Sequence, residues 1–135
     1  MPDYVAYHST EVMGYEYEAC DSTTFVSRKP RSVLDGAIGE RVWTISGTGT
    51  KNRSRKARFR LMSVYRPSEI RVCTDFYEIT GPTEFAFDPP VELNSLDWFP
   101  ELKREQSNFS LGFNPISSRR VLTALEQLLN ERQNK

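Results

Sequence analysis

The sequence contains few of the residues that usually build a metal or redox centre. It has two cysteines and one histidine among its 135 residues. Cys20 and Cys73 stand in no CxxC or CxxH pattern, so their spacing predicts no zinc site. Neither cysteine has a pattern of basic neighbours that would activate a thiol, and we expect both to be inert.

Motifs of nucleotide-binding proteins and hydrolases are also missing. The chain has no GxSxG, no P-loop, no HExxH and no dinucleotide fingerprint. Its one histidine is His8, and acid–base catalysis needs a positioned partner that the sequence does not define. We therefore expect no catalytic residue and no cofactor, although a small enzyme built around His8 stays an alternative.

Long apolar runs are absent as well. The chain has no stretch of about 18 apolar residues that could cross a membrane. Met1-Pro2-Asp3 does not open a secretory leader. We therefore expect a cytoplasmic protein with reduced thiols and no membrane partner. The oligomeric state cannot be predicted from these features.

The composition is that of a polar globular protein. Hydrophobic residues make up 38% and charged residues 27% of the chain, and 2 Trp, 6 Tyr and 8 Phe argue against disorder. A chain of this length buries about two-thirds of the surface that it exposes when unfolded. With no internal repeat and no linker, residues 1–135 are expected to form a single domain.

Strand patterns dominate the first part of the chain. In the segment 57–65, Ala57, Phe59 and Leu61 alternate with Arg58 and Arg60, which predicts one buried and one wet face. We expect Lys51–Lys56 to be the exposed tip of a hairpin. Gly81-Pro82 and Pro89-Pro90 are expected to end strands. The predicted strands cover 4–9, 24–27, 41–46, 57–65, 69–73, 76–81 and 109–113, with 85–90 as an edge strand or loop.

Two further segments favour helix. The segment 32–38 predicts one helical turn or a wide loop, and 96–100 predicts a loop or a one-turn helix. The C-terminal segment of about 115–132 predicts a longer helix, with Asn114 as N-cap and Pro115 at its first position. Its apolar stripe is expected to pack on the sheet; the stripe consists of Val121, Leu122, Leu125, Leu128 and Leu129.

Charge is unevenly distributed although 18 basic residues balance 18 acidic ones. Residues 1–27 contain five acids and no Lys or Arg. The segment 51–60 contains no acid and six cations, namely Lys51, Arg53, Arg55, Lys56, Arg58 and Arg60. Such a field attracts an anionic polymer, and Arg binds phosphate bidentately. The alternative is a solvated hairpin whose arginines pair with carboxylates such as Glu78.

Aromatic side chains form a second candidate site. Tyr7, Trp43 and Trp98 could line a pocket that stacks on a planar ligand such as a base. The alternative is that they pack in the core, which we expect for Phe59 and Phe99. Trp43 directly follows the core-like Val42, so one of the two points to the opposite face of its strand.

Three segments resemble the PUA-like group of small β-barrels and, within it, the EVE- and ASCH-type domains. They are Tyr4–Ser9, Gly39-Glu40-Arg41-Val42-Trp43 and Ala57–Val64, and the resemblance covers roughly residues 4–80. Glu40 stands where those domains usually have Asp. The resemblance implies a mixed, mostly antiparallel α+β barrel of about residues 4–113 with the C-terminal helix packed on it.

The same resemblance implies a function. Its members bind RNA or a modified base in DNA at the mouth of the barrel, commonly without catalysis of their own. By position, Tyr7, His8, Ser9 and Trp43 lie near this mouth, with Trp98 as a rim residue. The basic hairpin would then clamp the sugar-phosphate backbone. The sequence therefore predicts a non-catalytic nucleic-acid-binding module.

A function of another class stays open at this point. An exposed sheet edge or the acidic N-terminal region could recognise a protein. The chain would then be an interaction module, for example an accessory subunit or an inhibitor.

Overall fold

The computed structural model describes residues 3–9, 22–48, 57–106 and 113–134. Within these ranges the chain forms a mixed α+β fold, in which the strands precede the longest helix. The strands are β1 (Tyr4–Ser9), β2 (Ser22–Ser27), β3 (Val42–Thr48), β4 (Arg58–Tyr65), β5 (Glu69–Val72), β6 (Tyr77–Glu92) and β7 (Phe113–Pro115). The helices are α2 (Arg31–Asp35), α3 (Phe99–Glu105) and α4 (Arg119–Gln133).

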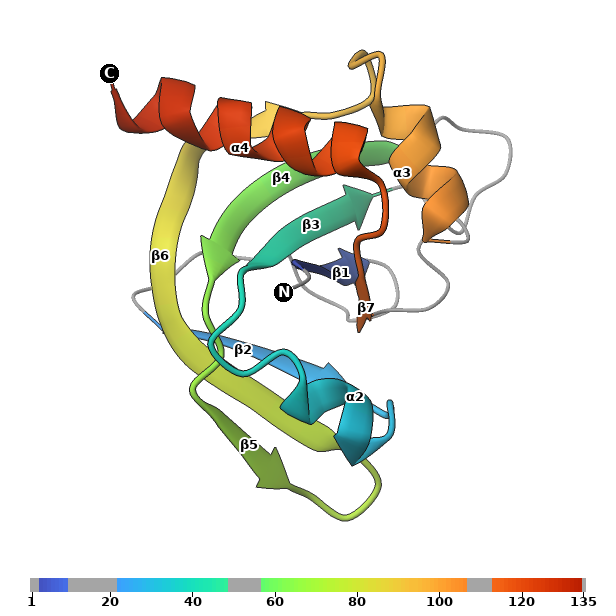
Figure 1. The fold of residues 1–135 in the computed structure, drawn as a ribbon, viewed down its shortest axis with the longest axis vertical. Coiled ribbons are helices and arrows are strands. Elements are labelled where there is room, and N and C mark those ends of the chain that lie inside the picture. The colour runs from blue at the N-terminus through green and yellow to red at the C-terminus, as the bar shows by residue number, and fades with distance from the viewer. Residues whose placement is uncertain (1–2, 10–21, 49–56, 107–112, 135) are drawn as a thin grey trace.

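The strands form one strongly curled sheet (Figure 1). Its order is β2-β6-β4-β3-β1-β7, and β5 pairs with β6 beside this path. Only β1 and β3 are parallel among these pairs; the others are antiparallel. The mixed, mostly antiparallel sheet is as predicted. In the described residues it is an open half-barrel that ends at β2 and β7, so closure into a PUA-like barrel stays a prediction.

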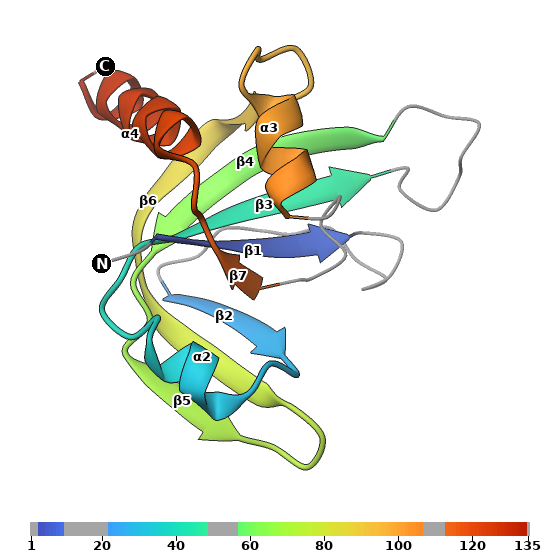
Figure 2. The ribbon, with the colours of Figure 1, turned by 45° about the vertical axis from the view of Figure 1, so that its right-hand side comes forward.

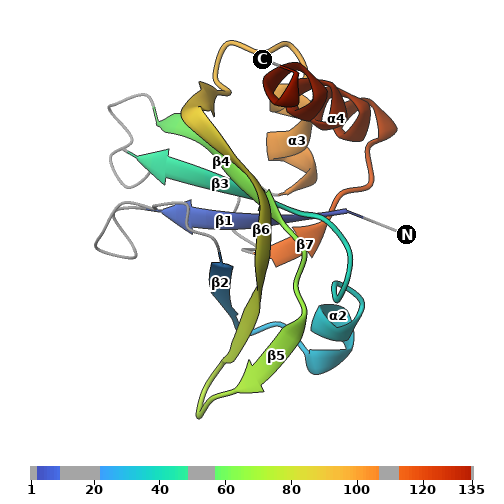
Figure 3. The same ribbon diagram turned by 90° about the vertical axis from the view of Figure 1, so that its left-hand side faces the viewer.

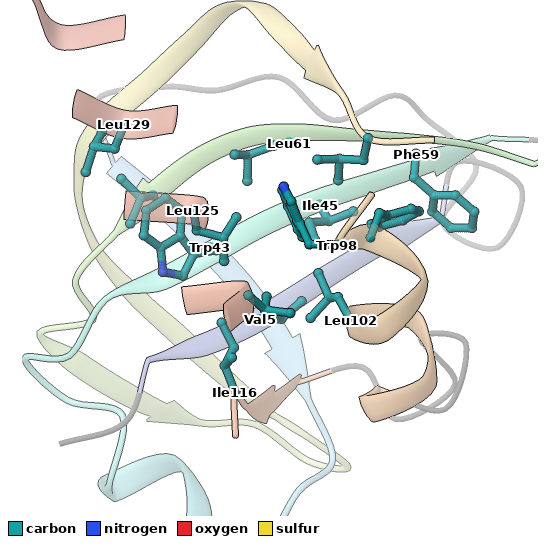
Figure 4. Packing of buried hydrophobic residues seen from close by; sticks show 14 of the residues in the cluster. Val5, Trp43, Ile45, Phe59, Leu61, Trp98, Leu102, Ile116, Leu125 and Leu129 are labelled. Atoms are coloured by element: carbon teal, nitrogen blue, oxygen red, sulfur yellow. The ribbon is translucent and has the colours of Figure 1, made fainter. Parts of the chain in front are cut away.

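The two faces of the sheet carry separate hydrophobic clusters. Val42 and Trp43 are both fully buried and belong to different clusters, because successive strand residues point to opposite faces. The cluster on the outer face packs under α3 and α4 (Figure 4). The cluster inside the curl lies between β1, β3 and β4 on one side and β2 and the start of β6 on the other; it includes Tyr4, Ala6, Phe25, Val42, Tyr65, Ile79 and Phe113.

The helices divide between the two ends of the sheet. Figures 2 and 3 show α3 and α4 together at one end, and α2 beside β5 at the other. The apolar stripe of α4 packs into the outer cluster as predicted, through the buried residues Val121, Leu125 and Leu129. The segment predicted as a loop or one-turn helix contains the start of α3, which continues to Glu105.

The strand β6 corrects the prediction that prolines end strands here. It continues through both Gly81-Pro82 and Pro89-Pro90. From Leu61↔Val91 to Ser63↔Ala86 the register moves two residues along β4 and five along β6, so residues 87–90 form an irregular bulge. The second proline pair lies in this bulge, where no ladder hydrogen bond is required of it.

The start of α4 is a second correction. Asn114 and Pro115, predicted as N-cap and first helical residue, belong to β7 and pair with Val5 and Tyr4 of β1. The helix begins four residues later, where the side chain of Ser118 accepts a hydrogen bond from the Val121 amide. Pairing with β1 therefore overrides a local capping signal that is sound by itself.

Candidate functional site

The hairpin formed by β3 and β4 carries the predicted basic segment. The two strands are consecutive and antiparallel, and their pairing extends to Thr48↔Arg58. Of the six predicted nucleic-acid-binding cations, Arg58 and Arg60 lie on β4. The other four, Lys51, Arg53, Arg55 and Lys56, lie outside the described residues. The structure thus describes the stem of this hairpin and its last two cations.

Arg58 is an exposed residue with an acidic partner. Its side chain is 60% exposed, and its Nε donates to Oε1 of Glu92 on β6. Glu78, which the sequence suggested as a partner for these arginines, instead pairs with Arg71, with 3.6 Å between its Oε1 and Nη1 of Arg71. An exposed ion pair of this kind contributes about 0–1 kcal/mol to stability, so Glu92 does not fix Arg58 firmly.

Arg60 differs from Arg58 in its electrostatic surroundings. Glu92 is the residue directly opposite Arg60 in the sheet register, yet its carboxylate reaches diagonally to Arg58. The Nε of Arg60 is buried and has no hydrogen-bond partner among the described residues. Burying an unsatisfied donor costs about 1–3 kcal/mol, and more when the group is charged. The charge of Arg60 is therefore not compensated by this part of the chain.

Arg60 belongs to a polar row that crosses three neighbouring strands. His8 on β1 is paired with Ser46 on β3, which is paired with Arg60 on β4. Residues at paired positions share a face, and this row lies on the inner face of the curl. His8 and Ser46 are 3% and 1% exposed. Toward the hairpin the inner face thus changes from apolar to polar.

A hydrogen-bonded pair lies next to this row. The hydroxyl oxygens of Thr44 and Ser63 are 2.6 Å apart, and Thr44 also donates to the Ser63 carbonyl at 3.1 Å. Both residues are fully buried. Their polar groups are satisfied within the sheet, which distinguishes them from the guanidinium of Arg60.

The aromatic pocket predicted from the sequence does not assemble. Tyr7, Trp43 and Trp98 pack with the outer cluster under α3 and α4, whereas His8 lies on the inner face. Trp43 is fully buried and Trp98 is 7% exposed. Tyr7 and His8 are successive strand residues, so they cannot line one pocket. Ser9 ends β1 opposite Gly47, and its side chain is not among those described.

A second cationic site, which the sequence analysis missed, lies beside the hairpin. A hollow of about 290 Å³ is lined by Asn94, Phe99, Pro100, Lys103 and Arg104. The Nζ of Lys103 is 5.1 Å from the ring centroid of Phe59 and 5.9 Å from that of Phe99. In the sequence these cations are flanked by Glu101 and Glu105, which hides them from a search for basic runs.

The neighbouring acids turn away from the hollow. The carboxylate of Glu105 accepts from the backbone amides of Ser117 and Ser118, ahead of α4, and that of Glu101 accepts from the Ser118 hydroxyl. Neither Lys103 nor Arg104 forms an ion pair within the described ranges. The hollow therefore keeps a net positive charge.

Asn94 fixes this hollow to the start of β4, at the loop end of the β3–β4 hairpin. Its Oδ1 accepts a hydrogen bond of 2.8 Å from the Phe59 amide, and its Nδ2 donates at 2.7 Å to the carbonyl of Ala57. Ala57 and Phe59 flank the first residue of β4. The cationic hollow and the basic hairpin are thus parts of one region of the molecule.

The cysteine thiols and potential metal ligands of the described residues do not form a second candidate site. Burial, followed by the hydrogen bond to Glu78 and its charge, raises the pKa of the Cys73 thiol against the opposing effect of Arg71. Cys73 is therefore held as a thiol rather than a nucleophilic thiolate. Cys20 lies outside the described residues. No group of three or more potential metal ligands occurs in the described part of the chain.

Within the described residues, no helix has the length and apolar composition that a membrane crossing requires.

Comparison with known proteins leaves the family assignment open. The chain matches no family model, no curated protein and no solved structure among those compared with it. The curled mixed sheet is compatible with a small β-barrel. Membership of the PUA-like group stays a prediction from the three sequence segments.

Proposed function

We propose that this protein is a non-catalytic nucleic-acid-binding module that contacts its ligand through the β3–β4 hairpin and the hollow beside the start of β4. One observation carries the proposal. Lys103 and Arg104 line a hollow that Asn94 ties to the hairpin, and that hairpin has four cations and no acid between Lys51 and Lys56. The hydrogen bonds of Asn94 therefore connect the hollow, which contains the cations of α3, to the hairpin, which carries those of the segment 51–56.

The mode of binding follows from the burial of the nearby rings. Phe59 and Phe99 are 5% and 2% exposed, and Lys103 lies over both. They cannot stack on a base without losing this packing. We therefore expect phosphate contacts to dominate over base stacking, with little sequence preference and a steep dependence on salt.

Affinity for single-stranded RNA and DNA oligonucleotides, measured over a range of salt concentrations, tests this proposal. Changing Arg53, Arg55 and Arg58 together to Ala should weaken binding and lower the slope of log K against log salt. Each phosphate contact contributes about 0.7 to this slope for a single strand, so three lost contacts lower it by about 2. Unchanged affinity would contradict the proposal.

A matched control separates local contacts from net charge. Changing Arg28, Lys29 and Arg31 to Ala removes the same number of cations, two from the segment between β2 and α2 and one from the first position of α2. This control should bind nearly as the wild type does. An equal loss in both variants would show that only net charge matters and would rule out the hairpin as the site. Changing Lys103 and Arg104 to Gln should weaken binding as the hairpin variant does.

A protein-interaction role is the second candidate, and the edge strand β5 favours it. Among the described strands β5 pairs only with β6, and Val72 at its end is 65% exposed. An open edge can accept a strand from another protein. Stoichiometric recovery of one protein after nuclease treatment, abolished by Val72→Lys, would support this function over nucleic-acid binding.

A further inference from the structure

The inner face of the sheet has a positive charge that the described residues do not balance. Arg58 and Arg60 are two residues apart on β4, and the carboxylate opposite them, Glu92, pairs with Arg58. Two cations against one anion leave Arg60 in excess, with a buried Nε that has no partner within the described residues. A bound oxyanion would supply both the missing acceptor for this Nε and the missing negative charge.

The neighbour of Arg60 restricts which counter-ion fits. Ser46 lies directly opposite Arg60, so about 5 Å separates their Cβ atoms. Ser46 is 1% exposed, and Arg60 is only partly buried. Because Ser46 is almost fully covered, a ligand at this row must approach from the exposed part of the Arg60 side chain, and a single oxyanion is the smallest group that meets the guanidinium there. A guanidinium fork and a hydroxyl are both donors that suit phosphate oxygens.

We propose that Arg60, beside Ser46, binds a phosphate group at the hairpin end of the inner face. The site differs from the cationic hollow, because Lys103 and Arg104 belong to α3 on the other face of the sheet. A free phosphate ion and the terminal phosphate of a nucleic acid share the chemistry that this site recognises. Arg60 can therefore bind phosphate whether or not the hairpin binds a polymer.

The melting temperature of a variant without the Arg60 charge distinguishes a ligand-binding arginine from a structural one. An arginine that holds the fold together is destabilising to remove, whereas a buried cation kept for a ligand is not. Arg60→Met preserves the aliphatic length of the side chain and removes the charge. Without phosphate, this variant should melt at the same temperature as the wild type or a higher one. A lower melting temperature for Arg60→Met would assign Arg60 a structural role and overturn the proposal.

Inorganic phosphate, titrated at constant pH and ionic strength, is the direct probe. His8 is the only histidine in the chain and lies in the same row as Arg60, so its imidazole NMR signals report on this site without ambiguity. The wild type and the control Arg31→Met should show saturable shifts of these signals and a rise in melting temperature. Arg60→Met should lose both, and Arg60→Lys should show at least tenfold weaker affinity.

Oligonucleotides with and without a 5′-phosphate distinguish the two sources of the ligand. A preference for the phosphorylated form that disappears in Arg60→Met identifies a terminal phosphate as the ligand. Equal binding of the two forms, with a saturable response to inorganic phosphate, identifies the free ion. No saturable response to either probe in the wild type, or the same response in Arg60→Met, would overturn the proposal. The hollow variant, with Lys103 and Arg104 changed to Gln, should leave all of these responses intact, because both residues lie on the other face of the sheet.

Discussion

Asp3 accepts a hydrogen bond from the indole of Trp43, with 2.8 Å between Oδ2 and Nε1, and both residues are buried. The same carboxylate oxygen lies 3.0 Å from Nε of Arg41, which also contacts Glu126 of α4. The backbone carbonyl of Asp3 accepts from the Ile116 amide at 2.7 Å. One residue ahead of β1 thus connects β3, α4 and the segment between β7 and α4.

Removing the Asp3 carboxylate should destabilise the fold. In Asp3→Ala the indole N–H stays buried without an acceptor, and Arg41 loses its best-shielded partner. We expect the free energy of unfolding to fall by about 3 kcal/mol. Asp3→Asn keeps an oxygen that can accept from the indole and should lose less. Chemical denaturation measures both variants.

Asp97 offers a control of the same residue type. Its ion pair with Arg120 is 3.3 Å long, and its side chain is 86% exposed. Asp97→Asn should change stability by no more than about 0.5 kcal/mol. If Asp3→Ala were as mild as Asp97→Asn, the network around Trp43 would not contribute to stability.

Local patterns were sufficient to predict β1, the β3–β4 hairpin and the apolar stripe of α4. Each of these has a strong period of alternation or of helical spacing over several residues. The predictions for β6 and for the start of α4 were wrong because these features do not depend on a local pattern. The bulge at residues 87–90 and the pairing of Asn114 with Val5 depend on partners distant in sequence, which no local signal reveals.

The candidate site was only partly predictable on the same grounds. A run of cations is visible in the sequence, so the hairpin could be found. The hydrogen bonds of Asn94 to Ala57 and Phe59, and the pairing of Glu92 with Arg58 rather than Arg60, join residues that are distant in sequence, so no local pattern predicts them. The aromatic pocket failed because residue type cannot distinguish a ring that stacks on a ligand from one, such as Trp43, that packs under a helix.

Gly81 should tolerate no side chain. A Cβ atom at this position would lie 1.9 Å from the carbonyl oxygen of Arg66 and 2.7 Å from Cα of Pro67, and backbone atoms cannot move aside cheaply. We expect Gly81→Ala to cost about 3 kcal/mol. Gly39, with φ of +81° and no atom within 4 Å of the position that a Cβ would take, provides the comparison. Gly39→Ala should cost about 1 kcal/mol, from backbone strain alone. Equal losses in the two variants would contradict the close approach at Gly81.

Tyr4 should make stability depend on alkaline pH. Burial, and to a lesser extent the charge of Glu40, raise the pKa of its phenol above 10.0. The unfolded chain then loses this proton at a lower pH than the folded chain does. The contribution is fully present below about pH 10 and is lost as the pH rises from there through the folded pKa.

Tyr4→Phe isolates this effect. The difference in unfolding free energy between variant and wild type should be constant from neutral pH to about pH 9, and should shift in favour of the variant above about pH 10. Denaturant titrations at a series of pH values measure this difference. A difference that stays constant through the alkaline range would contradict the raised pKa of Tyr4.

Asn94 allows the connection between the hollow and the hairpin to be tested without removing a charge. Asn94→Ala deletes the acceptor for the Phe59 amide and the donor to the Ala57 carbonyl, at a cost of about 1–2 kcal/mol. Asn94→Asp keeps the acceptor, but it replaces the donor with an oxygen that faces the Ala57 carbonyl, and it adds a negative charge. Hydrogen exchange of the Phe59 amide should therefore accelerate in Asn94→Ala and stay close to that of the wild type in Asn94→Asp.

The variant Asn94→Ala also tests whether the hollow and the hairpin bind nucleic acid together. If the hollow and the hairpin act together, releasing the start of β4 from Asn94 lowers the effective concentration of one set of cations near the other. Asn94→Ala should then weaken nucleic-acid binding while leaving the salt slope nearly unchanged, because every cation is still present. A variant with faster exchange at Phe59 but wild-type affinity would show that the two cationic groups bind independently.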